Sequence, residues 1–197
     1  MEVPGGPENK LLVCLYEFLG TALLLIGINL TQGSNIGIGL ILVSALSLYD
    51  RVSGGHFNPA LTIGVFIKEG KVANLLLFAM IIVSQILGAT LGVFVAYGCQ
   101  YLNKDSNTLV PGIAVLCPNQ LLSKDLCTLT DSKAAISCLI AETTATFVLV
   151  SVILGVKYYH QGPNEIKFFL IGLTLCGLIT AIGPITGASI NPAVGLV

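Results

Sequence analysis

Apolar residues fall into five runs along the chain, and polar residues gather in the segments between them. The runs cover residues 11–28, 36–48, 72–98, 134–156 and 168–190. An α-helix rises about 1.5 Å per residue, so about 20 apolar residues cross the roughly 30 Å of hydrocarbon in a bilayer. Four runs are long enough for this, and we expect the shorter run 36–48 to span as well. The pattern therefore predicts an all-α membrane protein with five spans.

Composition and charge support a lipid environment and argue against nucleic acid as a partner. Hydrophobic residues make up 54% of the 197 residues and charged ones only 10%, whereas soluble domains carry about 25% charged residues. The formal net charge is −1 and the nine Lys and Arg are scattered, so no basic patch is available for a phosphate backbone. With the amino terminus in the cytosol, six of these nine fall on the cytosolic side, which is the usual bias.

The sequence repeats two elements in the same order, once on each side of a polar segment. Glu-x-x-x-Thr within an apolar run occurs at Glu17 and again at Glu142. An element that leads from Ser-Gly or Thr-Gly to Asn-Pro-Ala occurs at 53–60 and again at 186–193. Three spans separate the two Glu elements, so the copies enter the membrane from opposite sides, as in an inverted repeat. We therefore expect a first repeat over 1–102, a connecting outer loop over 103–132 and an incomplete second repeat over 133–197.

Each Asn-Pro pair is expected to start a short helix. Asparagine caps a helix by accepting from backbone N–H groups, and proline suits the first helical position because its missing N–H costs nothing there. The helix that begins at Pro59 is too short to cross a bilayer before Gly70 ends it, so it dips in from the cytosolic side. Its counterpart after Pro192 dips in from the other side. The amides of Asn58 and Asn191 then meet near the midplane, where they donate to a passing oxygen and the helix dipoles repel cations.

These motifs resemble those of the aquaporin, or major intrinsic protein, family. SGGHFNPALT (53–62) is close to the family's first pore loop, ITGASINPA (185–193) is close to its second, and Gln85-x-x-Gly88-Ala89 also fits. The resemblance implies an aquaporin-like inverted repeat of spanning helices with two re-entrant half-helices. It implies a passive channel for water or small uncharged solutes, with no enzyme activity and no cofactor. At the centre of the pore it places Asn58, Pro59, Ala60, Asn191, Pro192 and Ala193.

The resemblance also assigns roles outside the motifs, and there the chain departs from the family pattern. Glu17, Glu142 and His56 stand where family members brace the re-entrant loops, and neither His56 nor His160 has neighbours for a metal site. The four positions of the family's narrowest point are all apolar here: Ile38, Ile179, Ala188 and Val194. Water-specific members usually carry an aromatic residue, histidine and arginine at the first, second and fourth of these positions. Glycerol-conducting members usually carry aspartate at the place of Gly195. An apolar ring could pass small uncharged solutes or act as a dewetted gate.

The expected assembly is a homotetramer in a lipid bilayer, either the plasma membrane or an intracellular, vacuolar membrane. The sixth span of the family pattern is missing, since the sequence stops four residues past Ala193, and this predicts a truncated chain. Two interpretations of function are open: a conducting channel, and a non-conducting aquaporin-related membrane scaffold or subunit. Cys117 and Cys127 share the outer loop and could either pair or stay free.

Overall fold

The computed structural model describes residues 9–102 and 132–197, and most of this part of the chain is helical. The elements are α1 (Lys10–Leu30), α2 (Asn35–Ser53), α3 (Pro59–Glu69), the 3-10 helix η2 (Val72–Asn74), α4 (Leu75–Leu102), α5 (Ser132–Tyr159), α6 (Asn164–Thr186) and α7 (Pro192–Gly195). No strand occurs among the described residues. Five of the helices are long and apolar enough to cross a membrane. The predicted all-α membrane fold is therefore confirmed.

The ends of two spans differ from what hydropathy indicates. The last apolar run covers 168–190, but α6 begins at Asn164 and ends at Thr186, where Gly187 adopts a left-handed conformation with φ of 85°. The residues after Gly187 are small or apolar although they form an irregular loop, so hydropathy alone places the end too late. The short run 36–48 lies within the 19-residue helix α2, whose N-cap Ser34 accepts from a backbone N–H.

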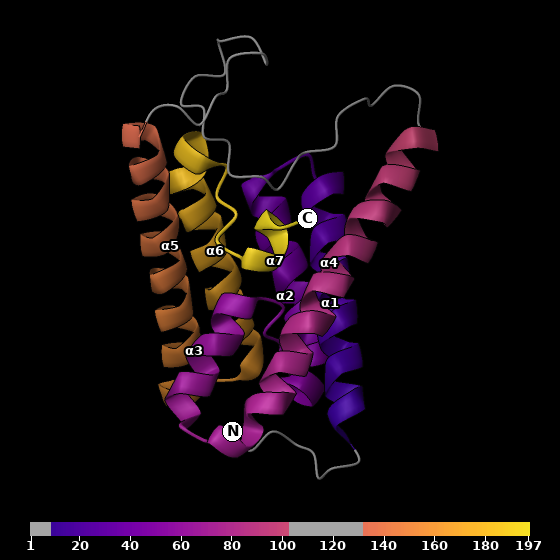
Figure 1. Ribbon diagram of the computed structural model, residues 1–197, viewed down its shortest axis with the longest axis vertical. Helices are drawn as coiled ribbons and strands as arrows, with labels where there is room; N and C mark the ends of the chain where they lie inside the picture. The colour runs from indigo at the N-terminus through magenta and orange to yellow at the C-terminus, as the bar shows by residue number, and fades with distance from the viewer. Residues whose placement is uncertain (1–8, 103–131) are drawn as a thin grey trace.

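Glycines allow the spanning helices to cross closely. α1 packs against α4 and α2, and α2 packs against α6, which in turn contacts α5 (Figure 1). A Cβ atom added at Gly88 or Gly92 of α4 would collide with backbone carbonyl oxygens of α1, so these two helices touch through their backbones. Gly39 of α2 and Gly172 of α6 meet in the same way. Close crossings through small residues are the usual packing of helices in lipid.

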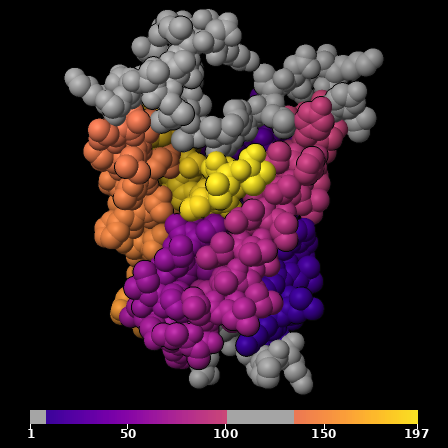
Figure 2. Space-filling model, in the orientation of Figure 1, coloured from indigo at the N-terminus to yellow at the C-terminus, as the bar shows by residue number. Residues whose placement is uncertain are grey.

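The two short helices lie between the long helices and approach each other from opposite ends. In Figure 1, α3 rises from the end of the molecule where the chain begins, and α7 lies at the tip of a loop that descends from the other end. α3 is close to the predicted half-helix, and Gly70, with φ of 64°, terminates it. α7 is a single turn that contacts α3. Figure 2 shows α7 at the molecular surface between α4 and α5.

The predicted division into repeats falls partly outside the described residues. The connecting segment 103–132 lies there except for its last residue, and so do Cys117 and Cys127. The division into 1–102 and 133–197 stays a prediction. Within the described residues, α1 to α3 and α5 to α7 both follow the order of two long helices and one short helix.

Candidate functional site

The two Asn-Pro-Ala motifs form matching helix starts. Asn58 precedes Pro59 at the first position of α3, and its Oδ1 accepts from the Ala60 N–H at 2.8 Å. Asn191 precedes a proline at the first position of α7, and its Oδ1 accepts from the Ala193 N–H at 3.0 Å. Both asparagines have the extended backbone that an N-cap residue requires. Each side-chain oxygen is thus used locally, and the amide nitrogen is available for other contacts.

The amide nitrogens connect the two motifs across the centre of the molecule. Asn58 Nδ2 donates to the carbonyl of Ile190 at 3.2 Å, and Asn191 Nδ2 donates to the carbonyl of Phe57 at 2.8 Å. The two asparagines therefore lie together, although 132 and 134 positions separate the bonded residues. An amide nitrogen carries two hydrogens, so these bonds leave one N–H of each asparagine for a further acceptor.

The residue before each asparagine holds an unusual backbone conformation. Phe57 has φ of 49° and Ile190 has φ of 50°, a left-handed conformation that costs a residue with a side chain about 1–2 kcal/mol. Each of them offers its carbonyl to the asparagine of the other motif. Sequence reasoning missed this because neither residue is a glycine. The only signal is that both occupy the same place in the two repeated elements.

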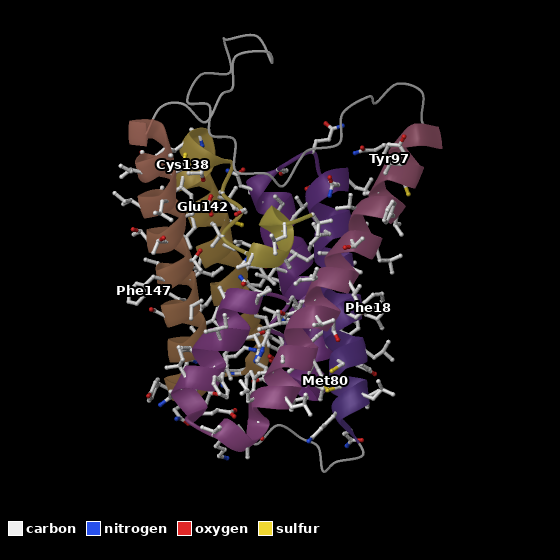
Figure 3. The ribbon with its side chains drawn as sticks, viewed as in Figure 1. Phe18, Met80, Tyr97, Cys138, Glu142 and Phe147 are labelled. Atoms are coloured by element: carbon white, nitrogen blue, oxygen red, sulfur yellow. The ribbon has the colours of Figure 1, made fainter. Side chains whose placement is uncertain are left out.

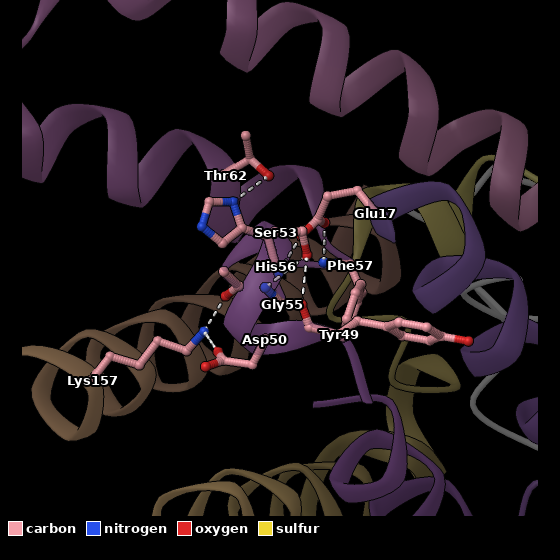
Figure 4. Close-up of polar contacts among 10 residues, drawn as sticks. Glu17, Tyr49, Asp50, Ser53, Gly55, His56, Phe57, Thr62 and Lys157 are labelled. Atoms are coloured by element: carbon pink, nitrogen blue, oxygen red, sulfur yellow. Dashed lines mark hydrogen bonds and ion pairs between the residues drawn. The ribbon is translucent and has the colours of Figure 1, made fainter. Parts of the chain in front are cut away.

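Glu17 of α1 is completely buried and contacts the first pore loop, residues 54–58. Its Oε1 accepts from the His56 N–H at 2.9 Å, and its Oε2 accepts from the Phe57 N–H at 2.7 Å (Figure 4). Gln85 Nε2 of α4 also donates to Oε2, at 2.8 Å. A carboxylate inside a membrane requires such partners. The same bonds satisfy backbone donors of a loop that hydrocarbon cannot satisfy.

Glu142 of α5 makes corresponding contacts to the second pore loop, residues 187–191. Its carboxylate accepts from the N–H groups of Ser189 at 3.2 Å and Ile190 at 2.8 Å, and from two hydroxyl groups. Figure 3 shows Glu142 directed into the molecule, whereas Phe147 on the same helix is directed outward. Both glutamates thus contact the loops that they are expected to brace.

A buried polar group connects the first pore loop to α3 and α4. Thr62 Oγ1 donates to the Asn58 carbonyl at 3.0 Å, accepts from Gln85 Nε2 at 2.9 Å and lies 3.3 Å from His56 Nδ1. The His56 ring stacks on Phe78. Sequence reasoning did not single out Thr62, because a threonine four residues after a cap gives no chemical signal. Among the described residues there is no group of three His, Cys, Asp or Glu that could hold a metal ion.

A cavity of about 100 Å³ in the centre of the bundle is the candidate pore. It is large enough for several water molecules. Asn58 and Asn191 line it, and so do the four residues expected at the constriction: Ile38, Ile179, Ala188 and Val194. Apart from His56, Phe57 and Ser189, the rest of its wall consists of glycine and aliphatic residues. Within the described part of the chain, no Lys, Arg, Asp or Glu side chain lines this cavity.

An ion pair that the sequence did not reveal lies beside the first pore loop. Lys157 Nζ of α5 lies 2.6 Å from Asp50 Oδ1 of α2, and the two side chains are 8% and 5% exposed. The same ammonium group donates to the Gly54 carbonyl (Figure 4). The partners are 107 positions apart, so no local pattern links them.

Five apolar spans, two short helices that meet at their N-termini and a central cavity lined by two asparagines define a membrane channel. The sequence profile of the major intrinsic protein family matches residues 11–197. The chain belongs to this family, as its motifs predict. The expected class of function, a passive channel in a membrane, is confirmed by this membership.

Relatives of known name agree with the assignment. Aquaporin AqpM of Methanothermobacter thermautotrophicus is 29% identical over 91% of this chain and 79% of its own length. A probable aquaporin AqpM of Archaeoglobus fulgidus is 33% identical over 80% of this chain and 58% of its own length. A probable glycerol uptake facilitator protein of Thermotoga maritima is 31% identical over 92% of this chain and 79% of its own length.

Proposed function

We propose that the central cavity conducts water or other small uncharged solutes passively across a membrane. The observation that carries this proposal is the central cavity: its walls are mostly aliphatic, and each of the two asparagine amides that line it donates to a carbonyl of the other pore loop. The amides offer donors to a neutral oxygen, while the positive N-terminal end of α3 disfavours cations. The relatives include both aquaporins and glycerol uptake facilitators, and both names fit a neutral solute. No catalytic step and no cofactor belong to the proposal.

The apolar ring formed by Ile38, Ile179, Ala188 and Val194 is proposed to set the selectivity. These side chains offer no hydrogen bond, so a water molecule at the ring gives up bonds to bulk water without replacement. Each unmet bond costs about 1–3 kcal/mol. We therefore expect slower water passage than through a ring that carries histidine and arginine, and weak discrimination against other small neutral molecules.

Stopped-flow light scattering on proteoliposomes tests both statements. The chain as it stands should pass water and glycerol faster than empty vesicles. Val194→Arg with Ile179→His should raise the ratio of water to glycerol permeability at least about tenfold. The larger arginine side chain narrows the ring against glycerol, and the added donors, worth about 1 kcal/mol each, replace bonds that water gives up there. Val194→Ile with Ile179→Leu is the matched control, since it keeps the ring apolar at similar volume and should leave the ratio unchanged.

Two results would contradict the proposal, each at a different point. If the Arg/His variant passes glycerol at the parent's rate, the ring does not set the selectivity. If the parent chain is indistinguishable from empty vesicles in both assays, the alternative of a non-conducting scaffold or subunit replaces the channel.

For assembly and location we propose a homotetramer in the plasma membrane or a vacuolar membrane. The outward faces of α4, α5 and α6 expose large apolar side chains, among them Phe94, Phe147 and Leu173. Lipid or a neighbouring subunit must cover these faces. Native mass spectrometry of the protein released from detergent measures the subunit number, and microscopy of a tagged chain locates the membrane.

A further inference from the structure

The two pore loops are held differently. The first loop donates to Glu17 of its own half through the N–H groups of His56 and Phe57. On another side, the carbonyl of Gly54 accepts from Lys157, which belongs to α5 and therefore to the other half of the chain. Figure 4 shows the two holding groups together: Glu17 beside Phe57, and Lys157 reaching Asp50 next to Gly55. The first loop is thus fixed between groups from both halves.

The Lys157 contact is built into the protein rather than lying on its surface. Both members of the pair are at least nine-tenths buried, and their atoms are 2.6 Å apart. Gly54 is the C-cap of α2 and has φ of 86°, so the carbonyl that Lys157 contacts lies at the negative end of that helix. A cation at this position stabilises the helix end. One ammonium group therefore joins the end of α5, the end of α2 and the first residue of the loop.

Among residues 9–102 and 132–197, the second pore loop has no equivalent of this contact. Asp50 stands eight positions before Asn58, and eight positions before Asn191 is Gly183, which has no side chain. Lys157 stands fifteen positions after Glu142, and the same distance after Glu17 is Gln32, which has no charge. The ion pair is therefore not part of the repeated pattern. If it served only to support the shared fold of the two halves, both pore loops would be expected to have one.

The first pore loop needs a second support because space lies behind it. A second cavity, of about 40 Å³, is lined by Asp50, Gly54, His56 and Lys157 among others. His56 also lines the candidate pore, so this part of the loop is a wall between two cavities. Without the Lys157 contact, the loop has room to shift away from the pore, and Asn58 would shift with it.

We propose that the Lys157–Asp50 pair is a clamp between the two halves of the chain that positions the first pore loop for conduction. Lys157 and Asp50 are positioning residues, because they act on the solute through the loop and do not line the pore. The effect on transport rests on the proposed channel function. The effect on the loop itself does not, and it can be measured separately.

The test compares three variants with the parent chain in nanodiscs and in proteoliposomes. Lys157→Met breaks the clamp and leaves the Asp50 carboxylate buried and unpaired, which destabilises a protein strongly. Asp50→Asn with Lys157→Met breaks the clamp but leaves no buried charge, so thermal stability should return close to that of the parent. Lys68→Met is the matched control, because Lys68 contacts Tyr159 of α5 at 2.9 Å but this contact is exposed. Backbone hydrogen exchange, thermal stability and solute permeability are measured for each.

With the clamp as proposed, the double variant keeps parental thermal stability while the amides of residues 55–57 exchange at least about tenfold faster and the amides of α4 do not. Its permeability per folded protein should fall to a similar extent, and Lys68→Met should change neither. Parental exchange and parental permeability in the double variant would overturn the clamp, and so would a permeability that follows thermal stability in all variants. If the parent itself does not conduct, the proposed function fails, and the exchange rates of the loop still decide the clamp.

Discussion

Replacing Glu17 by glutamine removes one charge from the centre of the protein without changing its shape. Glu17 is fully buried and accepts three hydrogen bonds: two from backbone N–H groups of the first pore loop and one from Gln85. A glutamine has one oxygen and one NH2 group. If the NH2 takes the Oε1 position it faces the His56 N–H, and if it takes the Oε2 position it faces the Phe57 N–H. Either orientation leaves a buried backbone donor without an acceptor.

The cost follows from these contacts. A buried donor without a partner costs about 1–3 kcal/mol, and a hydrogen bond to a neutral oxygen is about 1 kcal/mol weaker than one to a charged oxygen. With one donor lost and two bonds weakened, Glu17→Gln should lower the free energy of unfolding by about 3–5 kcal/mol. The loss is large because the loop lies where no water can replace the missing bond.

Glu142→Gln is a matched comparison, since the carboxylate there has hydroxyl partners as well as backbone ones. Glu142 accepts from the hydroxyl groups of Thr186 and Ser189. A hydroxyl can rotate and accept from the new NH2 group, and Glu142 is only partly buried. An NH2 at either position still faces a backbone N–H, but at the Oε1 position it displaces only the long 3.2 Å bond from Ser189. We therefore expect a loss of about 1–2 kcal/mol, the lower part of the range for a donor without a partner.

Thermal unfolding in detergent, followed by the accessibility of buried cysteine thiols, measures both variants. At about 2–4 °C per kcal/mol for a chain of this size, Glu17→Gln should lower Tm by about 6–20 °C and Glu142→Gln by less than half as much. Glu17→Asp, which keeps the charge on a shorter side chain, serves as a control for disturbed packing. Equal shifts for the two glutamine variants, or a larger one for Glu142→Gln, would show that orphaned backbone donors are not what determines stability at these sites.

Three further substitutions separate packing from conduction. Gly88→Val should destabilise the protein by about 3 kcal/mol, because its side chain would collide with the backbone of Phe18. Gly98→Ala should stabilise α4 by about 0.5–1 kcal/mol, because nothing lies within 4 Å of the added carbon. Thermal unfolding should therefore shift in opposite directions for the two variants. Asn58→Asp keeps the cap acceptor but removes the donor to the Ile190 carbonyl, so solute permeability should fall at least about tenfold while α3 stays folded, and unchanged swelling rates would exclude the amide from the conducting path.

The spans and the helix starts could be predicted from the sequence because their causes are local. Apolar runs locate α1, α4 and α5 to within a few residues, and Asn58-Pro59 identifies the first turn of α3. The end of α6 could not be located in this way. The residues that follow Gly187 in the second pore loop are small or apolar because they pack against the helices. Their hydropathy is therefore similar to that of the span before them.

The contacts that hold the loops depend on distances that a sequence does not display. Glu17 lies 40 positions before Phe57, and only the repeat and the family resemblance suggested that it braces the loop. The contact between Lys157 and Asp50 could not be inferred from the repeat, because neither residue has a counterpart in the other half of the chain. The left-handed backbone of Phe57 could not be predicted either, because phenylalanine rarely adopts a positive φ. The packing of its phenyl ring against Gly20 is visible only in the structure.

At some residues of the pore loops a substitution changes stability and conduction together, and at others it changes conduction alone. Backbone N–H groups of the first pore loop are satisfied by Glu17, and the Phe57 carbonyl is satisfied by Asn191. Hydrocarbon offers no substitute for these partners, so any change to them disturbs the fold and the pore together. Ile38 and Val194 differ, because they line the cavity with aliphatic side chains, which form no hydrogen bonds. Selectivity can therefore change at the ring with little loss of stability, whereas a change to the bonds between Glu17 and the first pore loop affects both properties.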